Sequence, residues 1–409
     1  MKIVHVINRF FPAIGGAERH AYLLSKLLAE KGHSVTVYTT NSITSDDIPQ
    51  FSAKFPFVAQ KKIQVLPKEE IIDGIVVKRF PVYFRFWSFL NVPEFTLRLF
   101  DEEADIFHIH GYQPFTSLCS AIAVKAKDYR KPTVLTTHDV EMAESLPHYA
   151  HALLRFYDNS AGKLLLKLSQ RIIVLNYDDA IKLMKIGVPS TKLTYIPNGV
   201  DTEFFDPEKV NPENAKKFRQ KFRLDKNIIV FVGRLEKRKR VDLVLLAFKT
   251  VLGKLKNCSL LIIGPDYGEF EFLKAFASKL GILDKVIFTH KLSEEELRVA
   301  YSLSDVLVMA SEQEAFGLTL LEAMAMRVPV VAHSWKGMKY IVKDEKTGFL
   351  TNPGDTKDLA YHILRILTDK DTAKKMGGSA RVYVNENFNI KKVVNQIEQL
   401  YFELTSQND

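Results

Sequence analysis

The chain has 409 residues, 46% of them hydrophobic, and a net charge of +9. Because domains of about 100–200 residues are typical, this length predicts two domains, each with its own core. The charge is spread, since residues 1–200 hold 24 Lys and Arg against 19 Asp and Glu and the remainder hold 33 against 29. A nucleic-acid binder more often shows one basic stripe, so no nucleic-acid partner is expected. A phosphorylated ligand or an anionic membrane surface fits the charge better.

Cysteine usage and hydropathy indicate the compartment. Cys119 and Cys258 are the two cysteines, which argues against a disulfide framework and fits a reducing environment. The apolar run Met1–Ile7 is too short for the core of a signal peptide. No stretch approaches the roughly 18 apolar residues of a membrane span. We therefore expect a cytoplasmic protein, either free or held peripherally at the inner face of a membrane.

The chain opens with a predicted strand, a glycine loop, an amphipathic helix and a second strand. These elements are Lys2–Asn8, the loop through Gly15 and Gly16, Ala17–Lys31 with Gly32 as its C-cap, and Ser34–Thr40. Such a βαβ unit implies a parallel sheet. Further strands of the first half are expected at Ile75–Arg79, Ile106–Ile109, Thr133–Thr137, Arg171–Leu175 and Leu193–Ile196.

The loop Gly15-Gly16-Ala17-Glu18 lies between the first strand and the first helix. Glycines there let the backbone approach a ligand closely, although a tight turn alone would also require them. The spacing is not that of the G-x-G-x-x-G dinucleotide fingerprint, which disfavours an NAD enzyme.

An aromatic stretch follows between Phe80 and Phe100, with Arg79, Arg85 and Arg98 interleaved. Aromatic and basic side chains together are typical of a surface that rests on lipid headgroups or holds a lipid-linked acceptor. Ordinary core and loop packing explains the same pattern.

Histidines gather at two predicted strand ends of the first half. His108 and His110 alternate on one strand and so share a face, and His138 follows the next strand. A histidine in such a loop can hydrogen-bond or polarise a hydroxyl, whereas a lone histidine is often only a satisfied structural residue. A zinc site is conceivable, but cysteine ligands and a dedicated ligand helix are lacking, so no metal is expected.

The alternation of strands and helices restarts after residue 200. The turn Pro197–Asp201 and the polar stretch to about Lys226 predict the hinge between two domains. We expect domains at 1–200 and 201–386, and a C-terminal helix at about 387–409 that completes the first. Strands are predicted at Ile228–Val232, Leu260–Ile263, Val286–Thr289, Val306–Met309 and Val330–Ala332, and helices at Val241–Leu252, Phe270–Leu280, Glu294–Ser302, Leu318–Met326 and Ile390–Leu404. Two doubly wound α/β domains facing across a cleft are the expected fold, since ligands bind at such crevices.

Arg234 and four further cations follow the first strand of the second half, at Lys237, Arg238, Lys239 and Arg240. Such a loop is typical of a diphosphate clamp, with Arg as a bidentate fork and Lys as a point charge, or else of a solvated basic loop. Because this loop and the segment Glu314–Glu322 both follow strands of one parallel sheet, we expect both at the same edge.

The segment Glu314–Glu322 carries two glutamates eight positions apart. Gly317 suits a loop that enters the helix, so Glu314 is expected on the loop and Glu322 about one turn inside. A helix N-terminus exposes unpaired N–H groups, which makes the backbone of Phe316, Gly317 and Leu318 a seat for phosphate. The carboxylates on either side then suggest recognition of hydroxyls on a phosphorylated sugar.

One D-x-D triplet is present, Asp369-Lys370-Asp371, between two predicted helices, where Asp371 has the character of an N-cap. That position is poor for a metal bridging a diphosphate. If phosphate charge is neutralised, Arg234, Lys239 and the helix N-terminus must do it.

Together these motifs resemble the retaining glycosyltransferases of family 4 (glycosyl transferases group 1), which have the two-domain GT-B fold. The resemblance covers nearly the whole chain. Its motifs are Gly15-Gly16-Ala17-Glu18, the D-x-x-H-x-H segment from Asp105 to His110, Pro197-Asn198-Gly199-Val200-Asp201, the G-R-x-x-x-x-K of Gly233, Arg234 and Lys239, and the E-x7-E of Glu314 and Glu322.

The resemblance implies a nucleotide sugar on the second domain and an acceptor mainly on the first. Arg234 and Lys239 would hold the diphosphate, Glu322 the ribose, and Glu314 the transferred sugar. The backbone of Phe316, Gly317 and Leu318 would assist Glu314, and His110 would contact the donor sugar near the reacting carbon. Gly15, Gly16, His138 and Gly264 complete the expected donor site.

Three positions depart from the family pattern. Arg240 stands where the family usually has glycine, and Pro265 stands in the second-domain G-x-G, where it cannot donate an N–H. The usual G-G-x-P-E segment is Lys336–Tyr340, which places Tyr340 at the position of the glutamate. These changes bear on donor identity more than on reaction class.

The expected function is transfer of a sugar, with retention and without a metal or other cofactor, from a nucleoside-diphosphate sugar to a glycan, lipid-linked or small-molecule acceptor. A sugar-nucleotide-binding protein without turnover is an alternative, although a degenerate member would more often have lost one of the four charged site residues. A nucleotide-sugar epimerase is another alternative, and it would form product without an acceptor. A two-carboxylate glycoside hydrolase is disfavoured because the phosphate seat lies between the glutamates.

Overall fold

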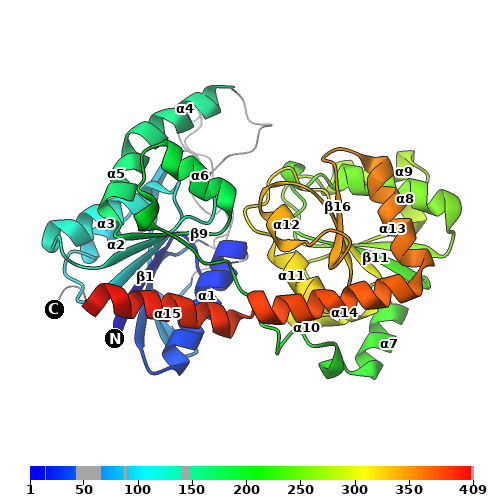
Figure 1. Ribbon diagram of the computed structural model, residues 1–409, viewed down its shortest axis with the longest axis horizontal. Coiled ribbons are helices and arrows are strands. Elements are labelled where there is room, and N and C mark those ends of the chain that lie inside the picture. The colour runs from blue at the N-terminus through cyan, green and yellow to red at the C-terminus, as the bar shows by residue number, and fades with distance from the viewer. Residues whose placement is uncertain (14, 43–65, 87–89, 141–147, 407–409) are drawn as a thin grey trace. The chain divides into compact units, whose positions relative to one another are not determined.

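The computed structural model describes residues 1–13, 15–42, 66–86, 90–140 and 148–406 (Figure 1). The chain forms two units. One contains the described residues up to Asn198 together with the last helix, and the other is Gly199–Asn389. Each unit is an α/β structure built on a mainly parallel sheet, which confirms the expected fold class.

The first unit contains a sheet of eight strands in the order β10-β9-β8-β7-β1-β2-β4-β3, parallel except for β3 against β4. The chain runs outward from β1 through β2 in one direction and from β7 through β10 in the other. The sheet is therefore doubly wound, with its switch point between β1 and β7. The strands are β1 Lys2–Ile7, β2 Ser34–Thr40, β3 Glu69–Ile72, β4 Ile75–Phe80, β7 Ile106–His110, β8 Thr133–Thr136, β9 Arg171–Val174 and β10 Leu193–Tyr195.

Both faces of this sheet are covered by helices. Alternate residues of β1 enter different cores: Ile3 packs with α1 and the last helix, and Val4 packs on the opposite face with α3 and α5. This alternation explains why the strand is apolar on both sides. The helices are α1 Gly16–Glu30, α2 Phe95–Arg98, α3 Phe115–Lys127, α4 His148–Asn159, α5 Ala161–Leu168 and α6 Tyr177–Lys185.

The aromatic stretch contributes a separate antiparallel ribbon, β5 Val82–Phe86 with β6 Leu90–Pro93, which the sequence did not predict. Phe80 stacks on Tyr38, Phe95 is fully buried, and Phe100 is half exposed. The part of the stretch outside the ribbon therefore supplies core packing, and the expected membrane contact stays a prediction. No helix in the described part of the chain is long and apolar enough to cross a membrane.

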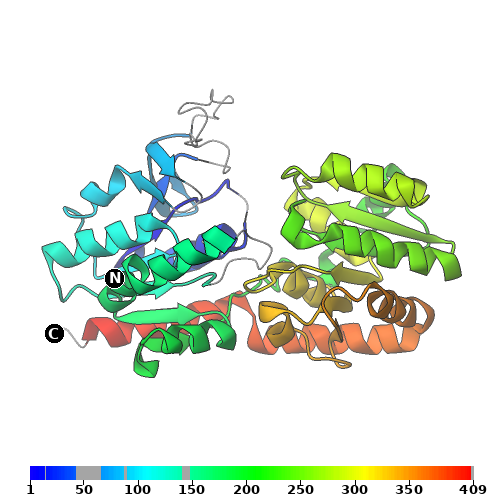
Figure 2. The same cartoon turned by 90° about the horizontal axis from the view of Figure 1, so that it is seen from above.

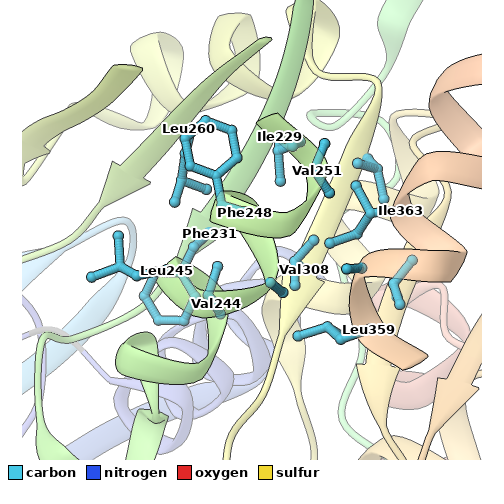
Figure 3. Close-up of a cluster of buried hydrophobic side chains, with 14 of the residues drawn as sticks. Ile229, Phe231, Val244, Leu245, Phe248, Val251, Leu260, Val308, Leu359 and Ile363 are labelled. Carbon is cyan, nitrogen blue, oxygen red and sulfur yellow. The ribbon is translucent and has the colours of Figure 1, made fainter. Parts of the chain in front are cut away.

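The second unit has six parallel strands in the order β13-β12-β11-β14-β15-β16, with the switch point between β11 and β14. Figure 3 shows its core, where Phe231 and Val308 of the sheet meet Phe248 of α8 and Ile363 of α13. The strands are β11 Asn227–Val232, β12 Cys258–Ile263, β13 Val286–His290, β14 Val306–Met309, β15 Val330–His333 and β16 Gly348–Thr351. The helices are α7 Pro212–Lys221, α8 Val241–Lys254, α9 Phe270–Lys279, α10 Glu294–Leu303, α11 Leu318–Ala325, α12 Lys336–Ile341, α13 Thr356–Thr368 and α14 Lys370–Asn387.

The chain returns to the first unit at its C-terminal end. Helix α14 packs in the second unit, and α15, Ile390–Ser406, lies beside α1 of the first (Figures 1 and 2). Val393 and Ile397 enter the same core as Leu24. The sequence prediction of an N-cap at Asp371 was wrong by two positions, because Asp369 accepts from the backbone N–H of Thr372.

Candidate active site

Two loops meet at the switch point of the second sheet. One follows β11 and spans Gly233–Arg240, and the other follows β14 and contains Glu312 and Glu314. Because β11 and β14 are parallel neighbours, their carboxyl ends open on the same edge. The backbone N–H of Glu312 donates to the carbonyl of Arg238 at 2.9 Å. The predicted meeting of the basic loop with the glutamate loop is therefore present in the structure.

Lys239 and Glu314 form an ion pair across these loops. Both are well shielded, since Lys239 is 9% exposed and the side chain of Glu314 is 18% exposed. Burial opposes ionisation of Glu314, but Lys239, Arg238 and Arg234 outweigh it and hold the pKa of this carboxyl below its usual value. A diphosphate that reaches Lys239 must compete with this internal carboxylate.

Arg234 is held at the start of the same loop. Its guanidinium lies over the ring of Tyr267, 5.1 Å from the centroid, and 3.1 Å from the carboxylate of Glu236. Arg238 reaches the same Glu236 oxygen at 2.9 Å. The ring and the carboxylate orient Arg234, and the same carboxylate holds Arg238 beside it.

Arg240, the departure from glycine, ties the two loops together. Its backbone is left-handed, with φ 48°, and its guanidinium binds Asp242 at 2.9 and 3.0 Å and also pairs with Glu312. These carboxylates raise the pKa of Arg240. With Arg238 and Lys239, three consecutive residues are thus anchored to the glutamate loop or to the start of α8.

The glutamate loop enters α11 as the sequence predicts. Gly317 is the N-cap with φ 103°, a conformation that favours glycine, and Leu318 is the first helical residue. Phe316 is buried and its ring packs edge-on against Phe388 at 6.0 Å. Glu322 lies one turn inside, is 3% exposed, and accepts from the hydroxyl of Tyr301 at 2.9 Å.

Two glycines allow the surrounding loops to approach this site. A Cβ on Gly264 would lie 1.9 Å from the carbonyl oxygen of Gly233, so the loop after β12 packs directly on the basic loop. A Cβ on Gly337 would meet the backbone of Ala315 at 2.5 Å. The carbonyl of Pro265 accepts from the N–H of Leu235 at 2.9 Å and extends the β11–β12 pairing beyond the strand ends.

In the first unit, the side chain of Glu18 fills the space beside the glycine loop. Gly15 has extended backbone, and a Cβ there would lie 2.1 Å from the carboxylate of Glu18. Glu18 is buried and pairs with Arg9 at 3.0 Å, and Gly16 begins α1. Gly15 therefore makes room for Glu18 at the helix N-terminus, and the expected ligand contact of Gly15 and Gly16 stays a prediction.

Five histidines gather around the switch point of the first sheet. His110 Nδ1 lies 3.1 Å from His138 Nε2, so the structure brings this expected pair together. His138 adopts a left-handed backbone with φ 56°. Burial lowers the pKa of His110 and of its neighbours, to about 3 for His138 and about 4 for His20, which keeps the rings neutral. The five are His5, His20, His108, His110 and His138.

His5, His108 and His110 place one nitrogen each within 4.8 Å of one another, the spacing of a metal site. Five of their six ring nitrogens, however, have hydrogen-bond partners: Ser25, Tyr401, Thr136 or His138. A metal ion would have to displace these contacts, because a nitrogen lone pair cannot serve both. The hydrogen bonds therefore favour a neutral network over a metal centre.

The sequence did not single out the partners that fix the site: Tyr301, Glu312, Asp242, His5 and Tyr401. His5 lies in the continuously buried part of β1 and pairs in register with His108 of β7, so a comparison of the two strands could have found it. The expected residues nevertheless divide into two groups, one in each unit. The group in the second unit offers cations beside a helix N-terminus and carboxylates for hydroxyls, which suits a phosphorylated sugar.

Family models match both halves of the chain. Residues 14–204 match Glycosyltransferase Family 4, and residues 212–383 match Glycosyl transferases group 1. An N-acetyl-alpha-D-glucosaminyl L-malate synthase of Bacillus anthracis is 26% identical over 96% of this chain and 95% of its own length. A GDP-mannose-dependent alpha-(1-6)-phosphatidylinositol monomannoside mannosyltransferase of Mycolicibacterium smegmatis is 30% identical over 62% of this chain and 66% of its own length.

Solved structures show the same fold. HepE of Anabaena in complex with UDP and glucose has a TM-score of 0.76 at 19% identity, over 98% of this chain and all of that one. A sucrose-phosphate synthase from Thermosynechococcus elongatus has a TM-score of 0.76 at 22% identity, over 99% of each chain. The predicted GT-B class is confirmed by these similarities.

Proposed function

Because the chain belongs to the family 4 glycosyltransferases, we propose that it moves a sugar from a nucleoside-diphosphate sugar to an acceptor hydroxyl, with retention of configuration and without a metal ion. The observation that carries this proposal is the contact of Lys239 with Glu314 where the two loops meet. A cation suited to phosphate and a carboxylate suited to sugar hydroxyls lie side by side there, which supports the proposal.

The leaving diphosphate is stabilised by charge that is already in place. Arg234 and Lys239 face the phosphates, and the first N–H groups of α11 add the positive end of a helix. This charge favours breakage of the bond to the anomeric carbon, which leaves a sugar with oxocarbenium character. In the retaining reaction that we propose, the acceptor hydroxyl enters from the same face and gives its proton to the departing phosphate.

The remaining side chains hold the two ends of the donor. Glu314 binds sugar hydroxyls when the diphosphate takes Lys239 from it, and it is not a nucleophile. Glu322 binds the ribose, and the hydroxyl of Tyr301 anchors its carboxylate. His110 contacts the sugar near the reacting carbon through Nε2, which has no hydrogen-bond partner among the described residues.

Relatives suggest the range of substrates. HepE structures hold UDP, glucose or UDP-glucose, and the relatives named above are named for malate and for a phosphatidylinositol monomannoside. We propose a nucleotide sugar as donor and a glycan, lipid-linked or small-molecule acceptor for this chain, in the cytoplasm or at its membrane face.

A thermal-shift panel of UDP- and GDP-sugars tests the donor site without an acceptor. A ligand at 100-fold its Kd adds about 2.7 kcal/mol to the free energy of unfolding, so the correct donor raises the melting temperature. The same donor should give no shift with Lys239→Ala and an undiminished shift with Lys237→Ala, since Lys237 is an exposed cation of the same turn. If no nucleotide sugar shifts the wild-type protein, the proposed donor site is refuted.

A further inference from the structure

A chain of buried hydrogen bonds links the last helix to the strand that carries His110. The hydroxyl of Tyr401, on α15, lies 2.5 Å from His108 Nδ1 and 3.4 Å from His5 Nε2. Beyond these rings, His5 Nδ1 lies 2.9 Å from Ser25 Oγ and His108 Nε2 lies 2.7 Å from Thr136 Oγ1. These hydrogen bonds thus join residues of α1, β1, α15, β7 and β8, and all five residues are buried.

The chemistry of this chain permits two patterns of protons. Each neutral imidazole has one donor and one acceptor nitrogen, and a hydroxyl can donate one hydrogen bond while accepting another. If Ser25 donates to His5, every later bond runs towards Thr136; if Thr136 donates to His108, every bond runs the other way. In either pattern the tautomers of His5 and His108 are fixed together, because the Tyr401 hydroxyl hydrogen-bonds both rings.

Both rings stay neutral because burial lowers the pKa of His5 to about 3 and that of His108 well below its ordinary value. Burial likewise raises the pKa of Tyr401. Loss of the Tyr401 hydroxyl would leave two ring nitrogens buried without a partner, which is the costly way to remove a hydrogen bond.

His110 rests on this chain. Its ring stacks on His108, with centroids 4.2 Å apart and planes 28° apart, and it is flanked by His138 on a near-parallel plane at 5.3 Å. Its Nδ1 is committed to His138. A turn of the His110 ring would break its stack on His108 and its contact with His138, and His108 is itself held by Tyr401 and Thr136.

We propose that Tyr401 is a positioning residue of the active site: its hydroxyl fixes the tautomers of His5 and His108, and the His108 ring in turn holds His110. The last helix, which lies 293 positions from His108 in sequence, thereby becomes part of the catalytic apparatus. The consequence for catalysis rests on the proposed function of His110, whereas the tautomers can be observed without any reaction.

The tautomers can be read from the imidazole nitrogen NMR spectrum of the 15N-histidine-labelled full chain at pH 7.5. We expect His5 and His108 each in a single neutral tautomer in the wild type. In Tyr401→Phe, which keeps the ring and removes only the hydroxyl, His108 should change or mix tautomers and the His110 signals should shift. Thr136→Val removes the other partner of His108 and gives a second route to the same result if Tyr401→Phe does not fold.

Tyr157→Phe is the matched control, because it removes a buried hydroxyl of the same unit that donates to the backbone carbonyl of Tyr112 at 2.6 Å and not to a histidine. It should lower the melting temperature and leave the histidine spectrum and kcat unchanged. Tyr401→Phe should lower kcat at least tenfold with the donor KM within about twofold.

Three results would overturn the inference: mixed tautomers of His108 in the wild type, an unchanged histidine spectrum in Tyr401→Phe and Thr136→Val, or a changed spectrum with unaltered kcat. If the wild-type protein transfers no sugar from any donor, the proposed function fails. The wild-type and variant spectra then still decide whether Tyr401 sets the tautomers.

Discussion

Lys239→Ala is expected to lower kcat/KM about 10²–10³-fold, the usual cost of removing one preorganised donor that faces developing charge. Lys239 is buried beside Glu314, so water cannot replace its ammonium group well. Lys237→Ala, in the same turn but exposed, should stay within about twofold of the wild type. The rate of nucleoside-diphosphate release, measured at saturating and at limiting donor, gives kcat and kcat/KM for the wild type and the two variants.

The double variant Lys239→Ala/Glu314→Gln distinguishes a phosphate-binding role of Lys239 from a role only as the counter-ion of Glu314. If Lys239 served only as the counter-ion of Glu314, then Glu314→Gln would remove the need for it, and the double variant would match Glu314→Gln alone. We expect instead that the double variant is less active than either single variant, because in the proposed site Lys239 binds the phosphates and Glu314 binds the sugar. Equal activity of Glu314→Gln and the double variant would contradict the phosphate role.

The first unit is expected to lose stability steeply between pH 6.5 and pH 5. Burial lowers the folded-state pKa of all five clustered histidines below 6.5, to about 3 for His5 and His138 and to about 4 for His20. As the pH falls, the histidines therefore bind protons in the unfolded chain while they stay neutral in the folded chain. Each histidine therefore lowers the free energy of unfolding by about 1.4 kcal/mol for every pH unit below 6.5, and it has no such effect above pH 6.5.

Five such groups together would cost up to about 7 kcal/mol at pH 5.5, comparable with the whole stability of a domain. Glu398, on the last helix of the same unit, acts at lower pH, because its pKa is lowered and its contribution to stability is lost only below the usual range of a glutamate. Calorimetry at pH 7.5, 6.5 and 5.5 should show one unfolding transition whose temperature falls steeply as the pH falls. In His20→Gln the unfolded chain takes up one proton fewer, so the free energy of unfolding should fall less steeply, by about 1.4 kcal/mol per pH unit. Equal melting temperatures at pH 7.5 and 5.5 would show that the cluster is not held neutral.

Local pattern predicts much of this fold. The strand Val306–Met309 was placed without error, and Glu314 and Glu322 fell on the loop and in the helix as expected. These features depend on short-range periodicity and on the glycine that α11 needs at its N-cap. The ribbon β5–β6 was missed because its aromatic and basic residues do not alternate in a simple way.

The partners of the site residues could not be predicted in the same way. Tyr301 meets Glu322 across 21 positions, and Tyr401 meets His108 across 293. No spacing rule connects residues so far apart, since the contact depends on how helices return to the sheet. The motifs therefore indicated the candidate functional groups, while only the structure showed what holds them, including the carboxylates that pair with Arg240.

The central claim is that this chain transfers a sugar from a nucleoside diphosphate with retention. In the most direct test, the wild-type protein is incubated with a panel of acceptors and with the α-configured nucleotide sugar that raises its melting temperature. The anomeric proton of the product is then followed by NMR. We predict release of one nucleoside diphosphate per sugar transferred and an α-configured product, in chelator-treated buffer as well as with Mg²⁺. A β-configured product, or conversion of the sugar without any acceptor, would contradict this account.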